Sequence, residues 1–142
     1  VIIDAVRSPI GVKNGSMIGI RPDDLTAQVV QGLLDRNQEI AFEQIEDLSL
    51  GCAFPEGPQG MLMGRGVVVL AGLPHTTTAN TVNRFCGSSM DALHQISTRI
   101  ECGDITVGIA AGVEDMFSIP NGGFAPDLNP LLAEQEYYIS MV

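Results

Sequence analysis

The stretch "TTTANTVNRFCGSSMDAL", residues 76–93, joins two kinds of local pattern at a cysteine. Residues 76–85 are rich in β-branched side chains, which favour a strand. From residue 90 onward apolar side chains recur at helical spacing, and Gly103 follows them as a plausible helix cap. The sequence therefore predicts a strand and then a helix over 90–102, with Cys86 at the turn between them.

The same alternation of strand and helix patterns runs through the first 116 residues. Short β-branched or apolar runs predict further strands, and amphipathic periodicity predicts further helices. The predicted strands cover 1–6, 45–54 and 105–114, and the predicted helices cover 21–37, with Asp23 as its expected cap, and 61–73. Because alternating strands and helices are joined by right-handed crossovers, we expect an α/β fold with a mixed, mainly parallel sheet and helices on both faces.

The segment 61–73 carries conflicting signals. Its three consecutive valines, Val67 to Val69, favour a strand, whereas its length and the Gly72 and Pro74 near its end favour a helix. We predict a helix.

The pattern changes after Met116, where proline, glycine and asparagine become frequent and no period survives. We therefore expect an α/β domain over 1–116 and the start of an irregular loop domain, incomplete at its C-terminus, over 117–142.

The composition excludes some classes of partner. The 142 residues carry a formal net charge of -10, which opposes binding to nucleic acid or to an anionic membrane. No apolar run reaches the roughly 18 to 20 residues of a membrane span, and the start lacks the pattern of a secretory signal. The three cysteines give neither a disulfide framework nor paired metal ligands. We expect a soluble protein of the cytoplasm or of an organelle matrix, with no bound metal.

The position of Cys86 favours a reactive thiol. At the N-terminus of a helix, unpaired N–H groups and the helix dipole stabilise a thiolate, which is the nucleophilic form. Gly87 fits this interpretation, because a residue without Cβ lets a carbonyl substrate approach and leaves its N–H free for an oxyanion. The structural alternative stays open, since buried cysteines and Gly/Ser-rich turns are common. Cys52 and Cys102 are expected to be unreactive.

The other titratable candidates are weaker. His75 lies in a loop after Pro74, and His94 lies two turns along the helix from Cys86, so neither spacing proves contact. Glu114 and Asp115 follow the last predicted strand, where they would either point into a site at the edge of the sheet or form a solvated pair.

Several motifs resemble, in order and spacing, the N-terminal part of the thiolase family. They are "VIIDAVRSPIG" at the start, "RPDDL" before the first helix, "AGLP" at 71–74, "VNRFCGSSM" at 82–90, "GD" at 103–104 and "AAGVEDM" at 110–116. The likeness covers nearly the whole chain. The segment around the cysteine is more similar to the degradative 3-ketoacyl-CoA thiolases of fatty acid metabolism than to the biosynthetic acetoacetyl-CoA enzymes.

The resemblance implies an acetyl-CoA acyltransferase with a layered α/β/α half-fold. Cys86 would be its nucleophile, would hold the acyl group as a thioester, and would offer its own N–H to the oxyanion. Gly87 and Asn83 would bind the oxyanion or position the site. Coenzyme A and acyl-CoA would be substrates, no cofactor would be bound permanently, and the protein would be a dimer or tetramer.

The family's activating histidine, its second catalytic cysteine and its Asn-Glu-Ala-Phe segment lie in a C-terminal half that is not in this chain. The chain alone is therefore expected to be inactive. Two rival interpretations remain at this point. One is a non-catalytic thiolase-like module that acts in dimerisation or partner binding, and the other is a condensing enzyme of the ketoacyl-synthase type.

Overall fold

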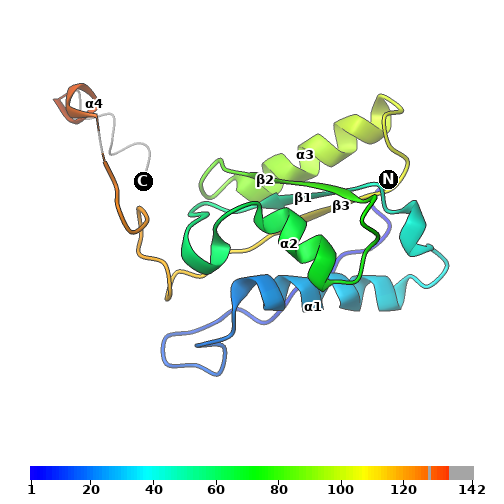
Figure 1. Cartoon of the computed structure of the whole chain (residues 1–142), viewed down its shortest axis with the longest axis horizontal. Helices are drawn as coiled ribbons and strands as arrows, with labels where there is room; N and C mark the ends of the chain where they lie inside the picture. Colours follow the sequence, from blue (N-terminus) through cyan, green and yellow to red (C-terminus); the bar gives the residue numbers. More distant parts are fainter. Residues whose placement is uncertain (128, 135–142) are drawn as a thin grey trace.

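The fold consists of a small sheet between two helical layers (Figure 1). The structure is a computed structural model, and it describes residues 1–127 and 129–134. Helix α3 covers one face of the sheet, and α2 covers the other with α1 packed against it. The predicted α/β architecture with helices on both faces is confirmed.

The sheet has three strands in the order β2-β1-β3, and all of their pairings are parallel. Strand β1 (Asp47–Gly51) is buried along its whole length. It pairs on one side with β2 (Thr78–Val82) and on the other with β3 (Gly108–Gly112). A helical layer covers each face of this strand, so the polar Asp47 and Ser49 are buried along with Leu48 and Leu50. The predicted strands at 45–54, 76–85 and 105–114 are confirmed, each in a shorter form.

The helices follow the predicted periodicity. Helix α1 spans Pro22–Arg36, α2 spans Met63–Leu70 and α3 spans Ser88–Glu101. The segment 61–73 is thus helical, as predicted. Short helical turns occupy Phe42–Gln44 (η1), Gly57–Gln59 (η2) and Pro130–Glu134 (α4).

The cap predicted at Asp23 was wrong. Arg21 is the N-cap of α1 and Pro22 takes the first helical position, where its fixed φ suits the helix and its missing N–H costs nothing. Asp23 lies in the first turn and accepts hydrogen bonds from the guanidinium of Arg21 at 3.0 and 2.7 Å.

The core lies between the sheet and the α1/α2 layer. It joins the apolar side chains of these elements with those of the loop residues that follow α1 and α2. Its buried members are Ala27, Val30, Leu34, Ile45, Leu48, Leu50, Met63, Val67, Val68, Ala71, Leu73 and Ile109.

The strand predicted at 1–6 was wrong. Val1, Ile2 and Ile3 are exposed, and the segment has no regular secondary structure. Among the residues that the structure describes, no backbone hydrogen bond joins this segment to β3, so β3 is an edge strand of the sheet, as β2 is on the other side. An apolar, β-branched composition favours a strand, but a strand forms only where a neighbouring backbone pairs with its N–H and C=O groups.

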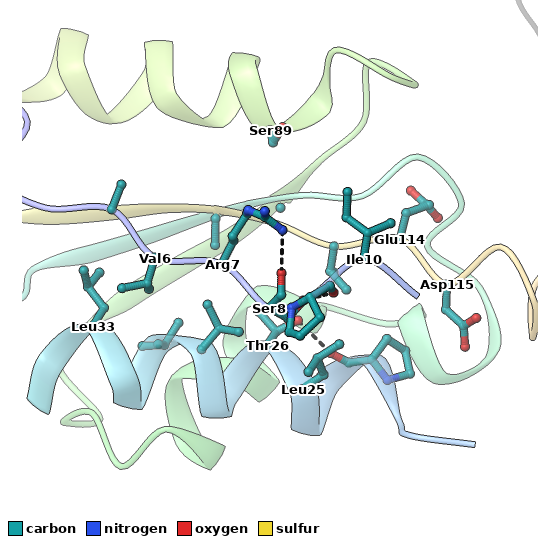
Figure 2. A pocket seen from close by; sticks show the side chains of 18 of the residues that line it. Val6, Arg7, Ser8, Ile10, Leu25, Thr26, Leu33, Ser89, Glu114 and Asp115 are labelled. Carbon is teal, nitrogen blue, oxygen red and sulfur yellow. Dashed lines mark hydrogen bonds between the residues drawn. The ribbon is translucent and has the colours of Figure 1, made fainter. Parts of the chain in front are cut away.

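A groove of about 800 Å³ lies between the N-terminal segment, α1 and β3 (Figure 2). Apolar side chains dominate its α1 side, including Leu25, Val29 and Leu33. Arg7, from the N-terminal segment, donates a hydrogen bond to the carbonyl oxygen of Ser8 at 3.1 Å.

Glycines let the start of α3 approach the sheet closely. A methyl group on Gly51, the last residue of β1, would overlap the backbone of Ser88 and Ser89. A methyl group on Gly112, the last residue of β3, would overlap the side chain of Ser89. The first turn of α3 therefore rests directly on the carboxyl ends of two strands.

Candidate active site around Cys86

The turn that carries Cys86 is closed by backbone hydrogen bonds and by one serine. The N–H groups of Gly87 and Ser88 donate to the carbonyl oxygens of Arg84 and Phe85, each at 3.0 Å. The Ser88 hydroxyl accepts from the N–H of Arg84 at 2.8 Å and donates to the carbonyl oxygen of Phe85 at 2.6 Å. Ser88 is only 4% exposed, so its hydroxyl is a fixed internal strut of the turn.

Phe85, the residue before the cysteine, has a left-handed backbone with φ of 45°. This conformation is rare for a bulky residue and costs on the order of 1–3 kcal/mol. The hydrogen bonds of the Ser88 hydroxyl to the N–H of Arg84 and to the carbonyl oxygen of Phe85 over-determine the turn and offset that cost. The result is that Cys86 is exposed, in spite of its place between a strand and a helix.

Asn83 ties the turn to the loop after β1. Its Nδ2 donates to the carbonyl oxygen of Ala53 at 2.9 Å, and its Oδ1 accepts from the N–H of Phe85 at 2.9 Å. The rings of Phe54 and Phe85 also pack together, with centroids 6.0 Å apart. The two loops therefore hold each other by a polar and an aromatic contact.

Cys86 lines a pocket of about 530 Å³ at the carboxyl edge of the sheet. The residues that follow β1, β2 and β3 form its walls, together with the first turn of α3. Parallel α/β sheets bind ligands at this edge. The lining residues are Gly51, Cys52, Ala53, Phe54, Phe85, Cys86, Ser88, Ser89, Gly112, Val113, Glu114, Met116 and Asn121.

Glu114 fixes the wall formed by the β1 loop. One carboxylate oxygen accepts from the N–H of Ala53 at 2.6 Å, and the other accepts from the N–H of Phe54 at 3.3 Å. The second oxygen also accepts from Nε2 of Gln59 at 2.8 Å. Gln59 is fully buried, and it donates as well to the carbonyl oxygen of Phe54 at 2.9 Å. Glu114 thus lines the pocket as an exposed residue, and these hydrogen bonds hold its carboxylate.

The three cysteines lie in different environments. Cys86 and Cys102 are exposed, whereas Cys52 is 1% exposed. Burial, reinforced by the negative charge of Glu114, raises the pKa of the Cys52 thiol to about 11. Cys52 is therefore a neutral thiol near pH 7, as expected for a core cysteine. Cys102 follows the last turn of α3, at the negative end of its dipole.

The N–H of Gly87 is used by the turn, so the expectation that it is free for an oxyanion was wrong. It donates to Arg84 because the tight turn before α3 needs that bond. Arg84 and Cys86 form an isolated parallel β-bridge within the turn.

The structure does not bring the histidines together with Cys86. His75 lies in the loop before β2, and His94 is exposed on α3. Neither lines the pocket at Cys86. Asp115 caps its own loop: burial raises the pKa of its carboxyl, but hydrogen bonds from Ser118 and from the N–H of Phe117 outweigh burial and lower it.

Sequence reasoning missed two residues of the site. Gln59 lies in the stretch "PEGPQG", which indicates only a loop, so nothing local suggested a buried amide. Ser88 looked like an ordinary first-turn residue. A serine two positions after the cysteine was the available signal for a hydroxyl that bonds back to the turn.

The described part of the chain gathers no group of three or more metal-ligating side chains. Within the same residues, no helix is both long enough and apolar enough to cross a membrane.

Comparison with known proteins identifies the family. The sequence profile of the thiolase N-terminal domain matches residues 1–128. The chain is 44% identical over 133 residues to a 3-ketoacyl-CoA thiolase of Saccharophagus degradans, an alignment covering 93% of this chain and 34% of that protein. It is 42% identical over 145 residues to the 3-ketoacyl-CoA thiolase of Bacillus subtilis, covering 99% of this chain and 37% of that protein. The chain spans about a third of the length of the curated relatives it matches. It belongs to the thiolase family and corresponds to the N-terminal domain of that family.

Proposed function

We propose that this chain carries the nucleophile of a thiolase-type acyltransferase that acts on 3-ketoacyl-CoA. In the degradative direction the Cys86 thiolate attacks the 3-keto carbon, and the bond between C2 and C3 breaks. The acetyl-CoA carbanion that leaves takes up a proton, and the shortened acyl group stays on Sγ as a thioester. The thiol of a second CoA then attacks this thioester, loses its proton to a base and releases the acyl product.

One observation carries the proposal: Cys86 is an exposed thiol in a fixed turn at the start of α3, and it lines the pocket where the ends of the parallel strands meet. The thiolate is stabilised in such a position by the helix N-terminus. The relatives named above supply the substrate class, since they are 3-ketoacyl-CoA thiolases.

The other roles follow from the same geometry. We propose that the N–H of Cys86 contributes to the oxyanion hole and that Asn83 positions the turn. Gly87 is kept as a positioning residue, because its N–H already bonds to Arg84. The proton-transfer groups are proposed to lie in a part of the protein outside these 142 residues, corresponding to the two-thirds of the relatives' length that this chain does not cover.

The test is a single-turnover acylation followed by peptide mapping. We expect acetyl-CoA to place an acetyl group on Cys86 of the 142-residue chain, while repeated thiolysis of acetoacetyl-CoA stays undetectable. Without its acid and base the chain lacks the roughly 10²- to 10⁴-fold that each proton transfer contributes. The control is Cys86→Ser, in which the adduct should disappear.

Equal acetylation of Cys86 and Cys102 would show that the site confers no selectivity and would favour the non-catalytic alternative. Sustained CoA-dependent cleavage by the chain alone would contradict the assignment of proton transfer to other residues.

A further inference from the structure

Glu114 and the turn of Cys86 are connected through one peptide group. The N–H of Phe54 donates to Glu114 at 3.3 Å, and the carbonyl oxygen of Ala53, on the same peptide, accepts from Asn83 Nδ2 at 2.9 Å. The amide oxygen of Asn83 then accepts from the N–H of Phe85 at 2.9 Å. A continuous chain of hydrogen bonds thus runs from the Glu114 carboxylate to the residue before Cys86.

The amide dipoles in this series of hydrogen bonds all point the same way. Each amide donates toward the carboxylate and accepts from the side of the turn, so each bond polarises the next and strengthens it. The charged end makes the first bonds of the chain stronger than bonds between neutral groups.

Glu114 is itself held in place. Gln59, which is fully buried, donates to one of its oxygens at 2.8 Å, and the N–H of Ala53 donates to the other at 2.6 Å. The N–H of Asp115 donates to Oε1 of Gln59. A buried amide with partners on both its oxygen and its nitrogen cannot move without leaving one of them unpaired, which is costly. The carboxylate is therefore a fixed anchor.

We propose that Glu114 is a positioning residue for Cys86, acting through the Ala53–Phe54 peptide and Asn83 on the left-handed turn at Phe85. Its function is to keep the thiol at the start of α3, where the helix N-terminus stabilises the thiolate. This inference rests on the proposed function in one respect only, namely that Cys86 is the reacting group.

A direct electrostatic role of Glu114 would have the opposite sign. Glu114 and Cys86 line the same pocket, so removing a negative charge there favours the thiolate. Loosening the turn disfavours it, because the thiol then leaves the helix N-terminus. Other ionisable groups near the site are Asp115, which directly follows Glu114, the ion pair of Arg84 and Asp91 at 3.2 Å, and the neutral thiol of Cys52.

The experiment measures the alkylation rate of Cys86 by iodoacetamide as a function of pH, with peptide-resolved mass spectrometry. The variants are Glu114→Asp, Glu114→Gln, Asn83→Ala and the double variant Glu114→Asp with Asn83→Ala. Glu114→Asp is the decisive one, since it keeps the charge but is one methylene shorter and cannot make the same bonds. Glu101→Gln, an exposed carboxylate at the far end of α3, is the matched control.

We expect Glu114→Asp and Asn83→Ala each to lower the rate near pH 7 by about fivefold, as for the loss of one hydrogen bond, and to move the pH profile upward. Cys86 of the double variant should react no more slowly than that of the slower single variant, because both substitutions interrupt the same series of hydrogen bonds. Glu101→Gln should leave the profile unchanged.

An unchanged profile in Glu114→Asp together with a faster reaction in Glu114→Gln would overturn the proposal and leave only a charge effect. Additive losses in the double variant would overturn it as well. A variant that unfolds is recognised by alkylation of Cys52 at the rate of Cys102, and Asn83→Ala then supplies the comparison with the parent chain. A failure of Cys86 to accept an acetyl group would contradict the proposed function and leave this coupling intact, so the two outcomes are distinguishable.

Discussion

Gly51, at the end of β1, and Ser88, at the start of α3, lie so close that no side chain fits between them. We expect Gly51→Ala to destabilise the protein by about 1–3 kcal/mol, as overpacking of a well-packed interior does. The clash is with backbone rather than with a flexible side chain, so the start of α3 has to shift. Urea unfolding measures the loss.

The matched control for this prediction is Gly66→Ala in α2, where a methyl group meets nothing within 4 Å. That variant should be stabilised by roughly 0.5–1 kcal/mol, since alanine is the better helix former. Equal stabilities of the two variants would mean that α3 does not rest on the sheet as described.

Ser88 and Ser89 are adjacent serines with different contacts, and we expect their alanine variants to differ. Ser88→Ala leaves the N–H of Arg84 and the carbonyl oxygen of Phe85 without their hydroxyl partner, at a cost of about 1–3 kcal/mol. Ser89→Ala should be within about 0.5 kcal/mol of the parent, as for an exposed position. Thermal unfolding of the two variants side by side makes the measurement. If Ser89→Ala lost as much stability as Ser88→Ala, the structural role of the Ser88 hydroxyl in the turn would be contradicted.

The three cysteines should alkylate in the order Cys86, Cys102, Cys52 near neutral pH. Cys86 and Cys102 are both exposed but lie at opposite ends of the α3 dipole, and Cys52 is buried. Peptide mapping after iodoacetamide treatment gives the order. Equal labelling of Cys86 and Cys102 would contradict the activation of Cys86.

Because the pKa of Cys52 is raised in the folded protein, we also expect the free energy of unfolding to depend on pH in the alkaline range. Its folded pKa, about 11, lies above the ordinary value of 9.0, so the unfolded chain loses this proton first as the pH rises. Its contribution is fully present below pH 9 and is lost progressively between pH 9 and about 11. The urea midpoint should therefore fall more steeply over this window in the parent chain than in Cys52→Ala. Parallel curves would show that Cys52 does not contribute.

The open edge of β3 predicts self-association of the chain when it is studied alone. Among the described residues β3 has a pairing partner on one side only, and an apolar groove follows that edge. Unpaired strand edges beside apolar surface tend to recruit another chain. Sedimentation velocity should show oligomers or aggregates at micromolar concentration. A stable monomer would contradict this prediction and the expectation of a homo-oligomer.

The strand-to-helix junction at Cys86 was predictable because its signals are local. β-branched residues, a glycine and a helical period follow one another in the chain, and the structure places β2, the turn and α3 in that order. The helix at 61–73 was predictable for a similar reason: Gly72 has φ of 78°, which ends a helix, and the valines Val67 and Val68 face the core.

Two errors arise because the structural context overrides a residue's local preference. Residues 1–6 have strand composition but no paired neighbour, and Asp23 has the chemistry of a cap but lies after Arg21 and Pro22. The contact between Gln59 and Glu114 could not be predicted at all. These residues are 55 positions apart, and only the packing of two strand ends brings them together.

For protein engineering, the support of α3 on Gly51 and Gly112 divides the pocket into positions that tolerate change and positions that do not. Side chains cannot be added at the two glycines, and Ser88 and Asn83 hold the turn. Met116 and Asn121 line the same pocket, are exposed and stand apart from these contacts. A library that aims to alter the proposed specificity for the acyl chain should therefore vary these two positions first and keep Gly51, Gly112, Ser88 and Asn83 constant.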